Sequence, residues 1–103
     1  MILTHVRGST FSYAGTAKLP EGTWSAVLKL SSAAGHLIED VTGAVTVFVA
    51  PDSNGHTHGL LFALDPSQTQ AWPVEALVGR VWFSDTEGVK VVSPPFEVSV
   101  EAV

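Results

Sequence analysis

Turn-forming residues recur along the whole chain at short and fairly even intervals, and this punctuation limits what the chain can fold into. Few of the segments between them are long enough for a helix of ordinary length. Short strands separated by turn signals are typical of β-sandwiches and small barrels. The interrupting residues are Gly8, Gly15, Pro20, Gly22, Gly35, Gly43, Pro51, Gly55, Pro66, Pro73, Gly88, Pro94 and Pro95.

Two segments show the alternation of a half-buried strand, in which successive side chains point to opposite faces. Residues 24–30 place Trp24 and Leu28 on one face and Ser25 and Lys29 on the other, and residues 96–101 alternate apolar residues with Glu and Ser. Residues 44–49 are apolar on both faces, which predicts a more buried strand. Further strands are expected at residues 10–14, 59–64, 77–84 and 89–93.

One short helical turn is predicted near residues 65–71. Asp65 is a good N-cap, Pro66 suits the first helical position and Gln68 completes a capping box, whereas Pro73 ends the segment. Seven or eight short antiparallel strands with one such turn indicate an all-β, immunoglobulin-like sandwich. A small closed barrel is the alternative. The length of 103 residues fits a single domain spanning residues 1–103.

Composition excludes several classes of partner. Hydrophobic residues make up 46% and charged residues 15%, which predicts a packed fold. The net charge is −5, and the few cations are scattered. Nucleic acid and anionic membranes are therefore not expected partners, because both require clustered Lys and Arg. The absence of cysteine excludes disulfides. The first residues show no secretory signal, so synthesis in the cytoplasm of the producing cell is expected.

Motifs for catalysis or cofactor binding are weak in this sequence. His56 and His58 would lie on one face of an extended segment, and two imidazoles can begin a metal site. Only Asp52, Asp65 and Glu75 could complete it, and Asn54-Gly55 indicates a polar hairpin loop instead. No Gly-x-Ser-x-Gly elbow and no phosphate-binding glycine loop occur. We therefore expect no enzyme activity, no metal and no cofactor.

The tryptophans differ in their expected positions. Trp24 lies on the apolar face of its strand and is assigned to the core, and Trp72 is expected to pack the helical turn onto the sandwich. Trp82 shares a face with Arg80, opposite Leu77, Val81 and Phe83. Because Trp and Arg are enriched at interfaces, Trp82 and Arg80 are candidate partner-binding residues. His56 and His58 complete this candidate set.

Several motifs together resemble a family of small tailed-phage proteins with immunoglobulin-like folds, including the N-terminal domain of some baseplate proteins. In order, they are Arg7-Gly8-Ser9-Thr10-Phe11, then Leu19-Pro20-Glu21-Gly22-Thr23-Trp24, then residues 60–64 with Thr69-Gln70-Ala71-Trp72-Pro73, and finally residues 81–88 before a valine-rich strand. The chain departs from the pattern at Gly79-Arg80, where an acidic residue is expected, and in the longer polar loop at residues 51–58.

The resemblance implies a virion structural protein of a phage or prophage, in the tail, baseplate or fibre attachment, with no catalytic residues. It would bind copies of itself and other phage structural proteins. Two alternatives come from the residues themselves. The charge of −5 is compatible with a small acidic inhibitor or adaptor of a host protein, and Trp72 with Trp82 is compatible with a carbohydrate-binding module.

Overall fold

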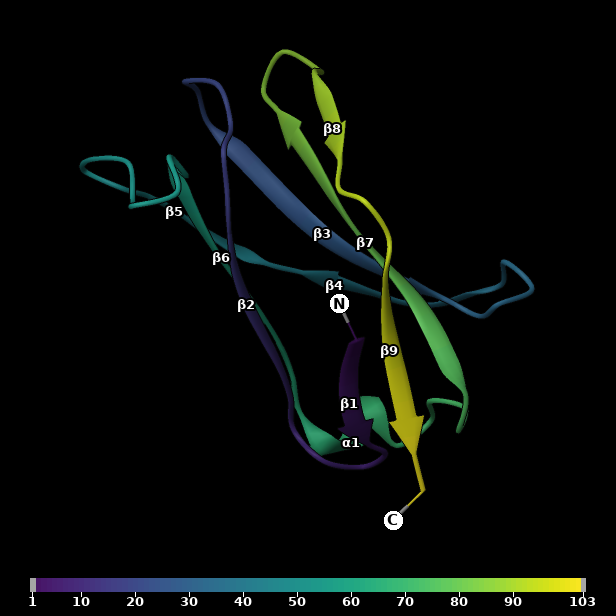
Figure 1. The fold of residues 1–103 in the computed structure, drawn as a ribbon. Coiled ribbons are helices and arrows are strands. Elements are labelled where there is room, and N and C mark those ends of the chain that lie inside the picture. The colour runs from purple at the N-terminus through teal and green to yellow at the C-terminus, as the bar shows by residue number, and fades with distance from the viewer. Residues whose placement is uncertain (1, 103) are drawn as a thin grey trace.

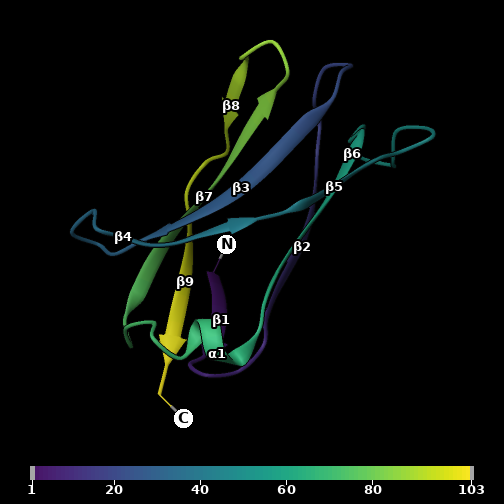
Figure 2. The ribbon, with the colours of Figure 1, turned by 180° about the vertical axis from the view of Figure 1, so that it is seen from behind.

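The structure is a computed structural model that describes residues 2–102. It contains two β-sheets packed face to face and one helical turn (Figures 1 and 2). The elements are β1 (Ile2–Val6), β2 (Phe11–Ala17), β3 (Trp24–Ser31), β4 (Leu37–Thr42), β5 (Ala44–Val47), β6 (His58–Leu64), α1 (Pro66–Thr69), β7 (Ala76–Asp85), β8 (Lys90–Val92) and β9 (Phe96–Glu101).

The larger sheet has the order β1-β9-β7-β3-β4, with β8 paired to β7, and the smaller sheet has the order β2-β6-β5. Immunoglobulin-like sandwiches place their C, F and G strands in one sheet and their B, E and D strands in the other. Here β3, β7 and β9 lie in the larger sheet and β2, β6 and β5 form the smaller one. The predicted immunoglobulin-like sandwich is confirmed, and the closed-barrel alternative is wrong because the two sheets remain separate.

The core lies between the sheets and consists of the inward faces of the alternating strands. In β3, the buried Trp24, Leu28 and Leu30 alternate with residues that are at least partly exposed, as the sequence pattern predicts. The largest fully buried side chains come from five strands and the helical turn: Phe62, Leu28, Leu30, Leu77, Val41, Val98 and Thr69. Burial of these apolar surfaces is the main stabilising term for a fold of this size.

The helical turn α1 is built as its sequence predicts. The Asp65 carboxylate accepts a hydrogen bond from the Gln68 backbone N–H at 3.1 Å, and the Gln68 side chain accepts one from the Asp65 backbone N–H at 3.1 Å. This reciprocal pair satisfies two backbone donors at the start of the turn. Trp72 follows the turn and is buried against the sandwich, as predicted. Among residues 2–102, no helix has the length and apolarity needed to span a bilayer.

The structure corrects the sequence-based prediction in three places. Strands β1 and β4 were not expected, which raises the count within residues 2–102 to nine, and β1 pairs with β9 in parallel rather than antiparallel. The predicted buried strand at residues 44–49 is shorter and mostly exposed, because β5 lies at the edge of the smaller sheet. Apolar residues on both faces of β5 therefore do not indicate burial here.

Candidate functional site

The outer face of the larger sheet carries an exposed tryptophan surrounded by apolar and cationic residues. Trp82 on β7 is directly opposite Val27 on β3, and the next pair outward on the same face is Arg80 with Lys29. Trp82 is 37% exposed, whereas its neighbours Val81 and Phe83 are buried in the core. The predicted facing of Trp82 and Arg80 is thus confirmed. We call the surface formed by Val27, Lys29, Val78, Arg80 and Trp82 the Trp82 face.

Lys29 links the aromatic and charged parts of the Trp82 face. Its ammonium lies 5.6 Å from the centre of the Trp82 ring, within the range of a cation–π interaction, and 3.8 Å from a carboxylate oxygen of Asp40. Both side chains of this ion pair are partly exposed, so the pair adds little stability. Arg80 has no carboxylate within 4 Å among the described residues. Its guanidinium therefore remains available to a carboxylate from another molecule.

A shallow depression of about 320 Å³ lies between the Trp82 face and the β3–β4 connection. Its walls combine small side chains with the indole and the two cations, and comprise Lys29, Ser31, Ser32, Ala33, Gly35, Val78, Arg80 and Trp82. An aromatic ring beside an unpaired guanidinium offers apolar contact area and a directional donor at one place. Chemically, this arrangement suits a protein surface that presents an apolar side chain next to Asp or Glu.

The structure separates the two histidines that the sequence placed together. His56 lies in the loop before β6, and its Nδ1 is 2.5 Å from the Thr16 hydroxyl oxygen. His58 is only 3% exposed and its Nδ1 is 2.7 Å from the Thr57 hydroxyl oxygen. A buried imidazole cannot reach a partner without rearrangement of β6. Of the candidate set, Trp82 and Arg80 lie together, His56 lies in a distant loop, and His58 lies in the core.

The acidic residues considered beside these histidines have other positions. Asp52 accepts hydrogen bonds from the Asn54 and His56 backbone N–H groups, both at 2.9 Å, and these hold the pKa of its carboxyl below the ordinary value. Asp65 caps α1, and Glu75 lies in the segment before β7. Within residues 2–102, no three His, Cys, Asp or Glu side chains are grouped so that they could hold a metal ion.

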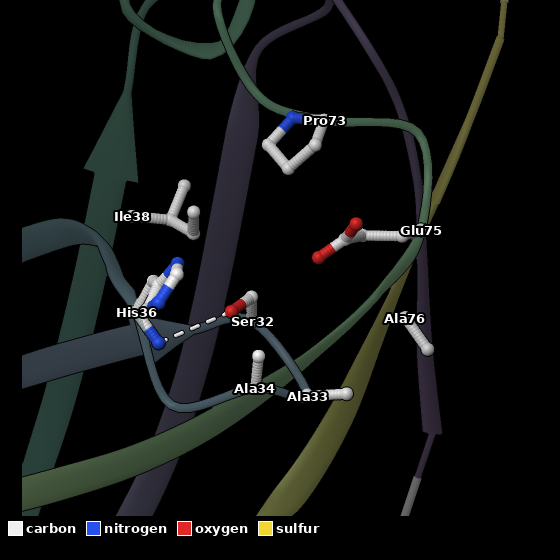
Figure 3. A pocket seen from close by; sticks show the side chains of 8 residues that line it. All are labelled: Ser32, Ala33, Ala34, His36, Ile38, Pro73, Glu75 and Ala76. Atoms are coloured by element: carbon white, nitrogen blue, oxygen red, sulfur yellow. Dashed lines mark hydrogen bonds between the residues drawn. The ribbon is translucent and has the colours of Figure 1, made fainter.

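A cleft of about 580 Å³ lies between the β3–β4 connection and the segment that joins α1 to β7 (Figure 3). The His36 imidazole and the Glu75 carboxylate turn toward it, beside Ile38 and Pro73. The Ser32 hydroxyl accepts a hydrogen bond from the His36 backbone N–H at 3.1 Å, not from the imidazole. Nucleophilic catalysis needs a hydroxyl bonded to its base. The cleft thus supplies an acid and an imidazole, but no activated nucleophile.

His5, whose imidazole is buried like that of His58, belongs to an aromatic cluster at the α1 end of the sandwich. The His5 ring lies 5.4 Å from the Phe11 ring and 5.2 Å from the Trp72 ring, and Phe11 and Trp72 are 5.3 Å apart. Burial lowers the pKa of His5 below 6.5. His5 Nε2 and Trp72 Nε1 are buried and have no hydrogen-bond partner among the residues that the structure describes. The burial of His5 and Trp72 indicates that they pack the core and do not contact a partner.

Sequence reasoning did not assign Lys29 or His36 to a site, and it considered Glu75 only as a possible metal ligand beside His56 and His58. Lys29 joins the Trp82 face through the β3–β7 register, which pairs it with Arg80, 51 positions later in the chain. The approach of His36 to Glu75 depends on two connections between strands, and no local pattern marks either residue. In contrast, the shared face of Arg80 and Trp82 follows from strand alternation alone and was predictable.

Comparison with known proteins adds no further assignment: no protein-family model matches the chain, and no curated protein matches its sequence.

Proposed function

We propose that this chain is a non-enzymatic binding module that serves as a structural component of a tailed-phage or prophage particle. It acts in the tail, baseplate or fibre attachment by contacting neighbouring proteins through the Trp82 face. The observation that carries the protein-binding part is the 37% exposure of Trp82 on a central strand beside the unpaired Arg80. The resemblance of its turns and core aromatics to small phage proteins supports the location in a particle.

The charge distribution favours one type of contact. Lys29 and Arg80 are two of only five cations in a chain of net charge −5. If two copies met through identical Trp82 faces, these cations would oppose one another, which is unfavourable. A contact between the Trp82 face and an acidic surface of a different kind avoids this repulsion. Such heterologous contacts generate rings when the rotation closes.

The burial of two of the three tryptophans weakens the carbohydrate-binding alternative. Trp24 and Trp72 are buried in the core, so Trp82 is the exposed tryptophan of the three. Flat aromatic platforms for sugars need accessible ring faces, and Lys29 lies over the Trp82 ring. The Trp82 face therefore fits a protein partner better than a glycan.

The decisive experiment is quantitative mass spectrometry on purified particles from the source strain. Presence of the chain at a fixed copy number that matches a rotational symmetry would support the structural role. Absence from particles, with abundant free protein in the lysate, would contradict it. A pull-down that then recovered a host protein in a salt-sensitive complex would favour the inhibitor or adaptor role instead.

A paired substitution tests the contact surface. Trp82→Glu should prevent incorporation of the chain into particles, since it places a carboxylate at the centre of the proposed interface. Thr86→Glu makes a similar charge change at an exposed turn residue and should be incorporated normally. Circular dichroism of both variants controls for folding. Normal incorporation of a folded Trp82→Glu variant would exclude the Trp82 face as the contact.

A further inference from the structure

The two long sides of the sandwich differ in whether a strand edge is left open. On one side the chain passes directly from β4 into β5 through Gly43, so the backbone itself joins the edges of the two sheets (Figure 1). On the other side, β2 forms the edge of the smaller sheet, and no strand of the described part of the chain joins it to the larger sheet. The sandwich is therefore open along β2.

A groove of about 340 Å³ follows this open side. Its floor consists of core side chains from both sheets, and its walls are β2 and the connection between β8 and β9. The lining residues are Tyr13, Gly15, Thr16, Ala17, Leu60, Val81, Phe83, Ser93, Pro94, Pro95 and Phe96. The groove is lined entirely by uncharged residues, although the chain as a whole carries −5.

The β2 wall has the properties of an unprotected sheet edge. Natural edge strands avoid pairing with other chains by carrying charges, prolines or bulges. The β2 strand contains no charged residue and no proline, and it pairs with β6 in continuous register over all seven residues. One row of its backbone N–H and C=O groups therefore faces outward without a strand partner, and a strand of this length spans about 23 Å.

The connection between β8 and β9, which forms the opposite wall of the groove, cannot supply a strand that pairs with β2. Ser93 is fixed to β7, because its N–H donates to the Val81 carbonyl at 2.9 Å and its hydroxyl accepts from the Val81 N–H at 2.9 Å. Pro94 and Pro95 have no N–H groups and cannot take part in a β-ladder as donors. Strand β1 covers β9 only from Glu97 onward, where it pairs with Ile2. Neither the β8–β9 connection nor β1 therefore covers the outer edge of β2 or the groove beside it.

We propose that this groove binds an extended segment of a partner protein, which adds to the smaller sheet as a strand beside β2. The segment is uncharged at its centre and carries apolar side chains at alternate positions. Its backbone bonds to the outward groups of β2, and one face of side chains enters the groove over Tyr13 and Phe96, whose rings are 5.2 Å apart. This mode of recognition combines main-chain hydrogen bonds with side-chain pockets.

Gly15 lies in the middle of β2 and lines the groove. The Tyr13 hydroxyl lies 3.4 Å from the position where a Cβ of Gly15 would stand, so the Tyr13 side chain leans along β2 across this residue. The absence of a side chain at Gly15 leaves room for the Tyr13 ring on this face of β2. This groove is separate from the Trp82 face, so it gives the module a second binding surface that does not depend on the first.

The test uses one designed strand, Thr-Val-Ser-Val-Thr-Val-Ser, joined ahead of Ile2 through a flexible Gly-Ser linker. Tethering gives an effective concentration in the millimolar range, so even weak strand addition is detected. Amide hydrogen exchange of β2 is measured by NMR. The expected result is protection of alternate β2 amides by about tenfold or more relative to the unmodified chain. A tethered control with the same residues but three consecutive valines should give no such protection.

Matched variants locate the site. Pro94→Glu in the tethered chain places a charge in the groove wall and should abolish the protection, whereas Pro51→Glu, in the exposed loop before β6, should retain it. Unchanged β2 exchange in the tethered chain would overturn the proposal. Concentration-dependent dimerisation of the unmodified chain with protected β2 amides would also overturn it, since the occupant would then be a second copy. The Trp82→Glu variant should leave the protection intact, which separates this proposal from the proposed function.

Discussion

The ring of Phe62 fills the space into which a side chain at Gly43 would project, with two ring atoms 2.8 and 2.9 Å from the position of a Cβ. Gly43 is the residue at which the chain crosses from the larger sheet to the smaller one, and its N–H donates to the Ala26 carbonyl at 2.9 Å. The crossing and the packing of the most deeply buried aromatic side chain therefore depend on one another.

Gly43→Ala should destabilise the protein by about 1–3 kcal/mol, the usual cost of overpacking a filled core. The free energy of unfolding from urea denaturation measures this. Gly15→Ala is the matched control, because there the nearest atom is the Tyr13 hydroxyl at 3.4 Å, an ordinary contact. Equal effects of the two substitutions would show that Phe62 moves aside and that Gly43 is not required.

His5 should make the stability depend on pH. Burial lowers its pKa below 6.5 in the folded state, so below pH 6.5 the unfolded state takes up more protons. The free energy of unfolding should therefore fall as the pH decreases from about 6.5 to the folded-state pKa, and then level off. No carboxylate lies within 4 Å of His5 among the described residues, and its ring neighbours are Phe11 and Trp72.

His5→Phe keeps an aromatic ring in this cluster and should remove the pH dependence between pH 7.5 and 5.5. The exposed residue His36 provides the control, since His36→Gln leaves His5 in place and should retain the dependence. Urea denaturation at both pH values measures the difference. A pH dependence that survives in His5→Phe would assign it to another group.

The predictable parts of the fold were those specified by neighbouring residues. Strict alternation located β3 and β9, and the Asp65–Gln68 pair located α1, because each signal lies within one element. Strand β4 was missed because it contains Glu39 and Asp40 and pairs with β3 across a register shift between Leu30 and Ser31. Strand β1 was missed because its burial depends on pairing with β9, far along the chain.

In the candidate site, too, the residues placed by alternation within one strand were predictable, whereas those placed by pairing between strands were not. Alternation within β7 was enough to place Trp82 with Arg80, but Lys29 reaches them only through the pairing of β3 with β7. His56 and His58 seemed adjacent because their segment was taken as fully extended. In the structure a turn built on Asp52 precedes β6, so one imidazole stays in the loop and the other enters the core.

The Asp65 cap should contribute to stability at neutral pH. Hydrogen bonds from Ser67 and the Gln68 backbone hold the pKa of its carboxyl below 3.8. This contribution is present above the unfolded-state pKa and is lost as the pH falls through the lower folded-state value. Asp65→Ala should lower the thermal midpoint at pH 7, whereas Asp65→Asn should retain most of it, because an amide oxygen can still accept from Gln68. Equal midpoints for Asp65→Ala and the unmodified chain would show that the cap is dispensable.

The three tryptophans should differ sharply in both accessibility and energetic role. Trp72 is 2% exposed and Trp24 is anchored by a 2.8 Å hydrogen bond from its Nε1 to the Pro20 carbonyl, whereas Trp82 is 37% exposed. Trp72→Ala should therefore cost about 3–5 kcal/mol of stability, and Trp82→Ala about 1 kcal/mol or less.

Acrylamide quenching of tryptophan fluorescence provides an independent check on the same assignment. In the unmodified chain one fraction of the emission should be readily quenched, and Trp82→Phe should remove that fraction while leaving the protected emission of Trp24 and Trp72. Trp72→Phe serves as the control and should leave the quenchable fraction in place. If Trp82→Phe instead removed protected emission, the indole would be buried, and the Trp82 face would have no aromatic group to offer a partner.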